Sequence, residues 1–465
     1  MNMINVRRLT VMTFLGAGML PGISAQSSLL QADTLQEMRI PTQWDLQSCI
    51  DYAKEQNITI RKNRITAAGT QIDVKTAKAA LFPSLSFSTG HQVVNRPYQE
   101  TSSRVSGSEI ISSNSKTSYN GNYGLNASWT LYNGNKRLKT IQQEKLNNQI
   151  AELDVATSEN NIQESIAQVY IQILYAAESV RVNENTLQVS IAQRDRGQEL
   201  LNAGSIAKSD LAQLEAQVST DRYQLVTAQA TLEDYKLQLK QLLELDGENE
   251  MNIFLPALSD ENVLAPLPAK REVYISALGL RPEIEASKLN VEASELGINI
   301  AKSSYFPTIS LSAGIGTNHT SGSDFTFGEQ VKNGWNNSIG LSVSVPIFNN
   351  RQTKSAVQKA KLQYETSMLS LLDEQKALYK TIETLWLDAN SAQQRYAAAN
   401  EKLKSTKISY ELTSEQFNLG MKNTVELLTE KNNLLQAQQE QLQAKYMAIL
   451  NTQLLKFYQG DQLAL

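Results

Sequence analysis

The feature that most constrains this chain is an internal duplication. Three landmarks occur twice, in the same order and at nearly constant spacing: an aromatic-proline break, a short apolar segment followed by asparagine, and an Asn-X-Gly turn. The three pairs are 81–86 with 305–310, 129–135 with 345–351, and 202–204 with 418–420. A repeat of this kind indicates one structural unit present in two copies.

Each copy predicts the same series of elements: a helix, a β-hairpin, a very long helix, a tip turn and a shorter return helix. The first repeat covers 44–244, with its hairpin at 84–131, its long helix at 136–201 and its tip at 202–209. The second covers 271–459, with its hairpin at 307–347, its long helix at 351–417 and its tip at 418–423. An equatorial linker at 245–270 joins the repeats, an N-terminal extension at 26–43 precedes them, and a tail at 460–465 follows them.

The two long helices exclude an ordinary compact domain. The stretch 136–201 has no proline and a single glycine, and the stretch 351–417 matches it in length. At ~1.5 Å per residue, each forms a rod roughly 100 Å long. The other helices are about half as long, so two of them must stack end to end beside each long one. On length, 210–245 is paired with 271–304, and 44–80 with 423–458, which gives four helical columns per chain.

All four predicted strands have one apolar face and one small polar face. In 119–131, Tyr, Leu, Ala and Trp alternate with Asn, Ser and Thr, and 84–89, 309–316 and 338–347 alternate similarly. Such strands fit either the core of a soluble sandwich or the wall of a membrane barrel. About eight strands are the fewest that close a membrane barrel, and an open edge is not stable in lipid. Several chains must therefore share one barrel, and three copies supply twelve strands.

Aromatic residues near the strand ends suit the two interfaces of a membrane, although single aromatic residues also occur in ordinary cores. These residues are Tyr119, Tyr123, Trp129 and Trp335. The loops 95–118 and 318–334 are rich in Ser, Gly and Asn, and we expect them to face the cell exterior.

The N-terminus has the pattern of a secretory signal. Arg7 and Arg8 precede a short apolar run, and Ala25 offers a cleavage site, so residues 1–25 are expected to be removed. The run is shorter than the ~20 apolar residues that a membrane-spanning helix needs. The whole chain has a net charge of −4, which leaves no basic excess for binding nucleic acid.

Motif content argues against an enzyme. The chain has one cysteine, Cys49, so an intrachain disulfide cannot form, and its two histidines do not occur in a paired-histidine metal motif. A phosphate-binding loop and a G-x-S-x-G nucleophile turn are also absent from the sequence. We therefore expect no catalytic residues, no cofactor and no metal.

In the order and doubling of these landmarks, the sequence resembles the TolC-like outer-membrane factors over nearly the whole predicted mature chain. The resemblance rests on Phe-Pro at 82–83 and 306–307, on the segments 129–134 and 345–348, and on the two tip turns. It implies a mainly α homotrimer with a small β part. A twelve-stranded outer-membrane β-barrel, with four strands per protomer, would continue into a long periplasmic α-helical barrel. The protein would then lie in outer-membrane lipid of a Gram-negative bacterium and extend into the periplasm.

The resemblance also implies a passive exit duct of a tripartite efflux or type I secretion system. An inner-membrane pump of the RND or ABC type would load the substrate, and a periplasmic adaptor would dock on the tip turns at Asn202, Gly204, Asn418 and Gly420. The alternative is a secreted or periplasmic coiled-coil scaffold or adhesin. That class explains the signal and the helices but not the paired strands.

The periplasmic gate of this family maps onto the tips with departures. The resemblance places its aspartate at Asp210, its arginine at Lys422 and its tyrosine at Phe417. Lysine keeps the charge but loses the bidentate geometry of arginine, and phenylalanine cannot donate a hydrogen bond. A latch built from these residues is expected to be weaker.

The constriction of the family carries two acidic positions, which correspond here to Glu426 and Thr429. An acid stands next to the second position, at Glu430. A threefold ring of Glu426 would favour cations at the mouth of the duct. Solvation of an exposed turn is the simpler explanation of the same charges.

Overall fold

The computed structural model describes residues 43–98, 102–106, 109–113, 116–246, 251–256, 263–321 and 325–463, without the side chains of 102–106 and 109–113. The predicted signal peptide at 1–25 lies outside these residues, as does the predicted extension at 26–43 except for its last residue. Everything described below belongs to one unit, Trp44–Leu465.

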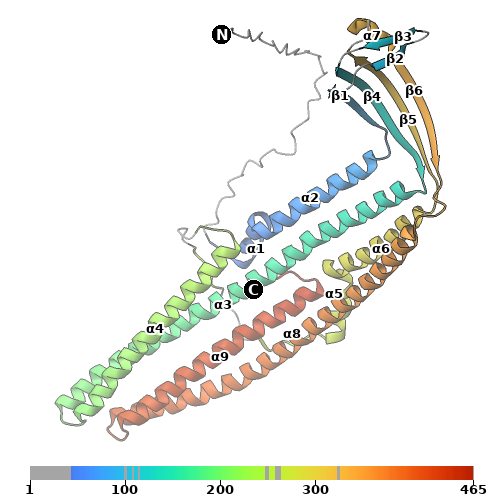
Figure 1. The fold of residues 1–465 in the computed structure, drawn as a ribbon. Helices are drawn as coiled ribbons and strands as arrows, with labels where there is room; N and C mark the ends of the chain where they lie inside the picture. Colours follow the sequence, from blue (N-terminus) through green and yellow to red (C-terminus); the bar gives the residue numbers. More distant parts are fainter. Residues whose placement is uncertain are drawn as a thin grey trace, which may run out of the picture. The chain divides into compact units, whose positions relative to one another are not determined.

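The helices and strands follow one another in two similar series (Figure 1). The first series contains α1 (Leu46–Gln56), α2 (Ile58–Ala79), β1 (Ser84–Asn95), β4 (Thr117–Asn133), α3 (Lys136–Asn202) and α4 (Lys208–Leu242). The second contains α5 (Lys270–Leu280), α6 (Pro282–Ser303), β5 (Thr308–Thr320), β6 (Asn336–Ser344), α8 (Gln352–Asn418) and α9 (Thr424–Gln459). The predicted mainly α fold with a duplicated unit is confirmed.

The connections between the strands contain elements that the sequence pattern did not indicate. A small hairpin, β2 (Ser102–Ser106) with β3 (Glu109–Ser113), lies in the first connection, and α7 (Phe327–Asn333) lies in the second. Strand β6 ends at Ser344, before Pro346, and is shorter than the range 338–347. Proline has no N–H to donate to a neighbouring strand, which accounts for the early end.

Strands β1, β4, β5 and β6 form one antiparallel sheet in the order β1-β4-β5-β6. Its register brings like side chains into rows across the sheet. One row consists of Leu85, Ala127, Ala313 and Ile339, and the next row on the other face of Ser86, Asn126, Gly314 and Ser338. Leu85 is 70% exposed and Ile339 84% exposed, so this chain does not cover its own apolar face. Among the described residues, β1 and β6 each have one edge that pairs with no other strand.

The half-length helices stack in a different pairing from the one that length suggested. α2 continues the line of α4, since the Asn57 side chain at the start of α2 donates to the Leu242 carbonyl at the end of α4, at 3.0 Å. α5 and α6 continue the line of α9, where Arg281 lies over the Tyr458 ring at 4.0 Å. The four ranges predicted from the sequence, 44–80, 210–245, 271–304 and 423–458, are of similar length, so length alone could not choose between the pairings.

The order of the helical columns repeats the order of the strands. Near the sheet, α2 packs on α3, α3 on α6, and α6 on α8, while toward the tips α4 packs on α3, α3 on α9, and α9 on α8 (Figure 1). Because α2, α3, α6 and α8 join β1, β4, β5 and β6 respectively, each strand continues into the column below it. The unit is a four-column strip with two free edges.

The stacked helices are joined by buried polar contacts at the middle of the strip. Arg281 is 6% exposed and donates to Glu164 and to Glu283, each at 2.8 Å. Pro282 begins α6, because a proline fits the first turn of a helix and disfavours helix in the residue before it. These contacts connect α3, α6 and α9 at one level.

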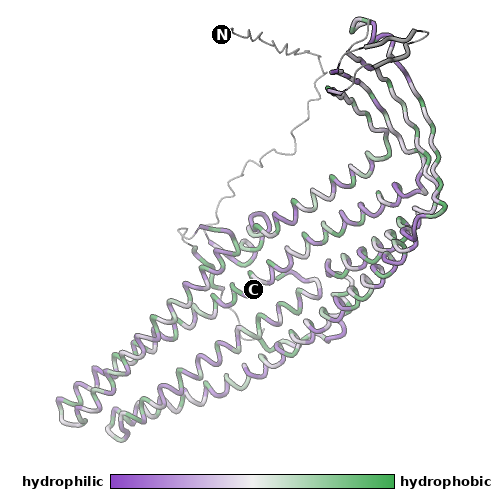
Figure 2. Tube along the Cα trace, viewed as in Figure 1, coloured by the Kyte–Doolittle hydropathy of each residue, from purple (hydrophilic) through white to green (hydrophobic). Residues whose placement is uncertain are grey.

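The largest apolar cluster of the described residues lies at the same middle level, around Trp44 and Tyr170. Elsewhere, polar and apolar residues alternate along every helix, as Figure 2 shows. Across the described helices, none combines the length and the apolar character that crossing a bilayer requires.

Candidate functional site: the hairpin tips and the two ends of the sheet

The two tip turns have the same backbone geometry. Gly204 and Gly420 adopt left-handed conformations with φ of 74° and 76°. In the first tip, Ser205 N–H donates to the Leu200 carbonyl at 2.8 Å, and in the second, Met421 N–H donates to the Gln416 carbonyl at 2.8 Å. This pattern ends a helix by satisfying its last carbonyls and favours glycine. Asn202 and Asn418 are the last residues of α3 and α8.

Within one chain, Asp210 and Lys422 each bind a different group and do not pair with each other. Asp210 accepts a hydrogen bond from the Ala207 N–H at 3.0 Å and so caps the start of α4. Lys422 forms an ion pair with Glu426 at 2.6 Å, and Glu426 accepts from the Asn423 N–H at 3.1 Å. The hydrogen bond from Lys422 holds the pKa of the Glu426 carboxyl below its usual range.

The other residues assigned to the gate occupy different environments. Phe417 is buried within its own hairpin, whereas Thr429 is exposed and Glu430 half-buried. The Thr429 hydroxyl donates to the Val425 carbonyl of the same helix at 2.8 Å. Phe417 therefore serves the packing of the tip in a single chain, and the acidic face of α9 consists of Glu426 and Glu430.

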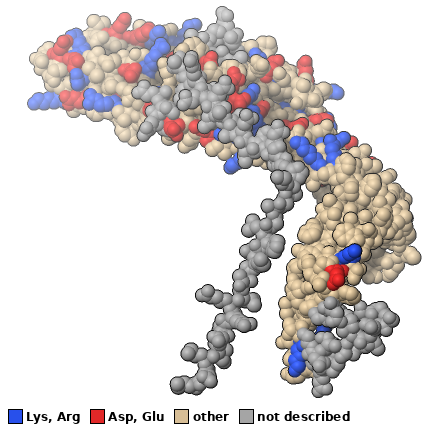
Figure 3. Space-filling model, turned by 90° about the horizontal axis from the view of Figure 1, so that it is seen from above, with Lys and Arg blue, Asp and Glu red and all other residues tan. Residues whose placement is uncertain are grey.

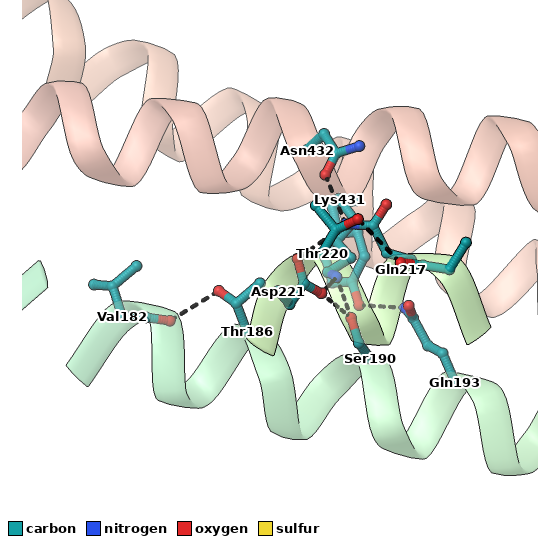
Figure 4. A network of polar contacts seen from close by, with 11 residues as sticks. Val182, Thr186, Ser190, Gln193, Gln217, Thr220, Asp221, Lys431 and Asn432 are labelled. Carbon is teal, nitrogen blue, oxygen red and sulfur yellow. Dashed lines mark hydrogen bonds and ion pairs between the residues drawn. The ribbon is translucent and has the colours of Figure 1, made fainter. Parts of the chain in front are cut away.

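The sequence reasoning missed a buried ionic cluster that joins the two hairpins. Lys431 on α9 reaches both Asp221 on α4 and Ser190 on α3 (Figure 4). Lys431 is 3% exposed and Asp221 1% exposed. The second oxygen of Asp221 accepts from the Gln217 amide at 2.9 Å. We call Ser190, Asp221 and Lys431 the lysine cluster.

Burial dominates the electrostatics of the lysine cluster. Desolvation lowers the pKa of the Lys431 ammonium, and Asp221 opposes that shift. A signal for the cluster exists in the sequence, because Lys431 stands midway between Leu427 and Leu435 at helical spacing. A charge inside an apolar stripe needs a partner, which a single sequence does not identify.

The predicted interface aromatics lie toward the two ends of the sheet. The Trp129 indole donates to the Leu81 carbonyl at 2.8 Å, near the helices. Tyr119 lies at the far end, where its hydroxyl contacts the His91 ring at 2.5 Å, and Tyr123 packs edge-on against the same ring. Ten residues at ~3.4 Å each, tilted by ~40°, give a height of about 26 Å between Tyr119 and Trp129.

That height matches the apolar band of an outer-membrane barrel, about 25 Å. Trp335, which precedes β6, is exposed at the far end. The described strands of the four-stranded sheet carry no Asp, Glu, Lys or Arg, and Figure 3 shows a nearly uncharged surface there beside a highly charged helical surface. Among the described residues, no group of three or more His, Cys, Asp or Glu side chains is arranged to hold a metal ion.

Comparison with known proteins agrees with this geometry. The profile of the family described as "Outer membrane efflux protein" matches residues 49–244 and 273–460, which are the two repeats. The outer membrane protein TolC of Escherichia coli is 22% identical over 441 residues, covering 92% of this chain and 82% of that protein. The outer membrane efflux protein BepC of Brucella suis is 24% identical over 294 residues, covering 63% of this chain and 61% of that protein.

A solved structure shares the fold. The structure of CusC, described by its transmembrane channel formation, superposes with a TM-score of 0.76 at 18% identity and covers 90% of this chain and 93% of that chain. The family profile covers well over half of the residues and falls on both repeats. The chain therefore belongs to the outer membrane efflux protein family.

Proposed function

We propose that this protein is the outer-membrane channel of a tripartite efflux or type I secretion system and conducts substrate passively to the exterior. The observation that carries the proposal is the open four-column strip, whose strands and helices follow the same order and end in two free edges. A strip of this kind encloses a passage only when copies of the chain join edge to edge.

Three copies are the number that the sheet supports. Four strands fall short of the smallest closed membrane barrel, while twelve strands leave room for a passage. Exposed apolar residues along the outer columns fit the same assembly, because they remain uncovered in a single chain. They include Ile58, Ile65 and Ile72 on α2 and Leu362 and Leu369 on α8. A coiled-coil scaffold does not need a sheet with these edges.

The tips are the proposed docking site of a periplasmic adaptor, which connects the channel to an inner-membrane pump of the RND or ABC type. Leu419, Met421 and Val425 are exposed around the second tip, next to Gly420. Small residues and exposed apolar side chains at the end of a hairpin support a protein contact there. Asn202 and Gly204 offer the corresponding turn in the first repeat.

Closure of the tip is proposed to involve Asp210, Lys422 and Phe417, with Glu426 and Glu430 lining the mouth. The present partner of Lys422 is an exposed glutamate one helical turn away, and exposed pairs of this kind contribute little to stability. Replacing Glu426 by Asp210 as the ion-pair partner of Lys422 therefore costs little free energy. Adaptor binding would then select the open arrangement of the tips.

The proposed function is tested with purified protein in detergent and in planar bilayers. We expect a trimer by mass measurement and discrete conductance steps after insertion. A stable monomer without conductance would contradict the proposal. A salt wash of isolated membranes separates the alternative, because a peripheral scaffold is released by salt and an integral barrel requires detergent.

The gate is tested by conductance of Asp210→Asn. This variant removes the charge while keeping an oxygen that can cap α4, so the tip should fold and the closed contact should weaken. We expect a higher single-channel conductance than for the unchanged protein. Glu215→Gln, an exposed neutralisation on the same helix, is the control, and equal conductance for all three proteins would rule out a role of Asp210 in closure.

A further inference from the structure

Basic residues are concentrated where the helices meet the sheet. The stretches 74–83, 134–143, 296–307 and 349–360 lead into or out of the four strands and contain no Asp or Glu. Figure 3 shows blue side chains gathered at the boundary between the charged helices and the uncharged sheet. We call the nine residues of these stretches the basic collar: Lys75, Lys78, Lys136, Arg137, Lys139, Lys302, Arg351, Lys354 and Lys359.

Helix electrostatics does not account for the basic collar. Lys78 and Lys302 lie in the last turns of α2 and α6, where a cation is favourable. Lys136 and Arg351, in contrast, lie at the first residue of α3 and the N-cap of α8, where the helix dipole disfavours a cation. Five other helices begin with an acidic residue in the first turn: α4, α5, α6, α7 and α9. The two helices that follow β4 and β6 thus have a basic residue at the N-terminus, where these five helices have an acidic one.

Ion pairing within the chain does not account for the collar either. None of its nine residues takes part in an ion pair among the described side chains. Arg137 donates to the backbone carbonyls of Ala80 and Thr130, and Lys139 donates to the Asn299 carbonyl at 3.3 Å. The collar therefore has positive charge without carboxylates to balance it, in a chain whose net charge is −4.

The surroundings of the collar indicate what balances it. Phe82 and Phe348 are 74% and 84% exposed and lie between the collar and the strands. From the sheet toward the helices, the order is an uncharged apolar wall, exposed aromatic rings and then lysine and arginine. A bilayer favours the same order: apolar residues in the hydrocarbon, aromatic residues at the interface, and lysine and arginine at the level of the headgroups.

We propose that the basic collar binds the phosphate groups of anionic phospholipids in the periplasmic leaflet of the outer membrane. Juxtamembrane clusters of Lys and Arg attract anionic headgroups within a Debye length of the surface. The bound lipids would set the depth of the barrel in the membrane and anchor the upper ends of the helical columns. The proposal rests on the sheet lying in the outer membrane and not on how the tip opens.

The experiment measures the lipid preference of the full-length protein reconstituted in phosphatidylcholine vesicles. Spin-labelled phosphatidylglycerol and phosphatidylcholine are compared by electron paramagnetic resonance, which gives their relative association with the protein. We expect about a threefold preference for phosphatidylglycerol at low salt, falling toward one at high salt because screening shortens the reach of the charges.

The test variant is Lys78→Gln, Lys136→Gln, Lys302→Gln and Lys354→Gln combined, which should lower the preference to about one. The matched control replaces four exposed lysines elsewhere on the helices, Lys62, Lys376, Lys404 and Lys407, by glutamine and should keep the preference. If the fourfold variant fails to assemble, the pair Lys136→Gln with Lys354→Gln is used, and a partial loss is expected.

Two results would overturn the proposal. One is an unchanged protein with no preference for phosphatidylglycerol, at any salt concentration. The other is a collar variant that keeps the preference but changes the ratio of cation to anion permeability, which would assign the collar to the lining of the passage. Neither result depends on whether the protein conducts ions. Conductance tests the proposed channel function, so the two proposals can fail separately.

Discussion

At the residue scale, the buried side chain of Lys431 connects the two helical hairpins. Its ammonium reaches two helices of the first hairpin from a helix of the second, so a single buried charge connects three helices. The pattern of leucines around it predicts the buried face correctly, with Leu427 fully buried. Its partners come from α3 and α4, and their identity depends on how the hairpins pack.

Replacement of Lys431 by methionine should destabilise the protein strongly. The variant leaves Asp221 buried without a cation, and the loss of one partner of a buried pair costs about 3–5 kcal/mol. Heat-induced dissociation of the purified protein, followed on gels, measures the effect. The double variant Asp221→Leu with Lys431→Met should recover most of the loss, because an apolar pair of similar volume needs no counter-charge.

Lys422→Met provides the matched control for that prediction. It removes a lysine from the same helical hairpin, but its partner Glu426 is exposed and remains solvated. We expect nearly unchanged dissociation for this variant. Equal effects of the Lys422 and Lys431 variants would show that the lysine cluster has no special part in joining the hairpins.

At the scale of elements, the tip turns favour glycine because of its backbone conformation and not because a side chain would clash. A Cβ atom at Gly204 would meet no atom within 4 Å, yet φ is +74°. Gly204→Ala should therefore destabilise the first tip by about 1 kcal/mol, while Gly204→Asn should cost less, since asparagine tolerates the left-handed region. The melting of the hairpins by circular dichroism measures both.

Gly69 offers a control of the opposite sign. It lies inside α2, and a Cβ atom there also has nothing within 4 Å, but its backbone is helical. Gly69→Ala should stabilise the protein by about 0.5–1 kcal/mol, because alanine loses less conformational freedom in a helix. If both alanine variants shifted stability in the same direction, conformation would not be the cause.

The elements that the sequence predicts well are those with a long, regular pattern. Helices α3 and α8 begin and end within a residue or so of the expected ranges, since no proline interrupts them. The stacking of the shorter helices was predicted wrongly, because it depends on contacts such as Asn57 with the Leu242 carbonyl. Hairpin β2–β3 and helix α7 were missed because their segments lack a long alternating or helical pattern.

At the scale of the whole molecule, the free edges of the strip predict contacts between copies. A cysteine on β1 at Ser86 and one on β6 at Ser342 should form disulfides between chains for at least one register in a scan of neighbouring positions. Gels without reductant would then show dimers and trimers. Cysteine at Asn126 on the central strand β4 is the control, because both edges of β4 are paired within the chain.

The native thiol does not interfere with this assay. Cys49 is fully buried, and desolvation raises its pKa to about 12, so very little reactive thiolate is present near neutral pH. Absence of cross-links at every register of β1 and β6 would contradict a barrel shared between chains. Cross-links at Asn126 as frequent as those at the edges would show that the reaction does not report on pairing.

The lysine cluster also breaks the near-equivalence of the two repeats. Counting from the tip glycines, the position of Lys431 in the second repeat corresponds to Glu215 in the first, which is exposed. In a closed tunnel, the interface between the two hairpins of one chain would contain this buried ion pair. The interface between hairpins of neighbouring chains would not. Hairpins would part in pairs, so the tunnel mouth would widen with threefold rather than sixfold symmetry.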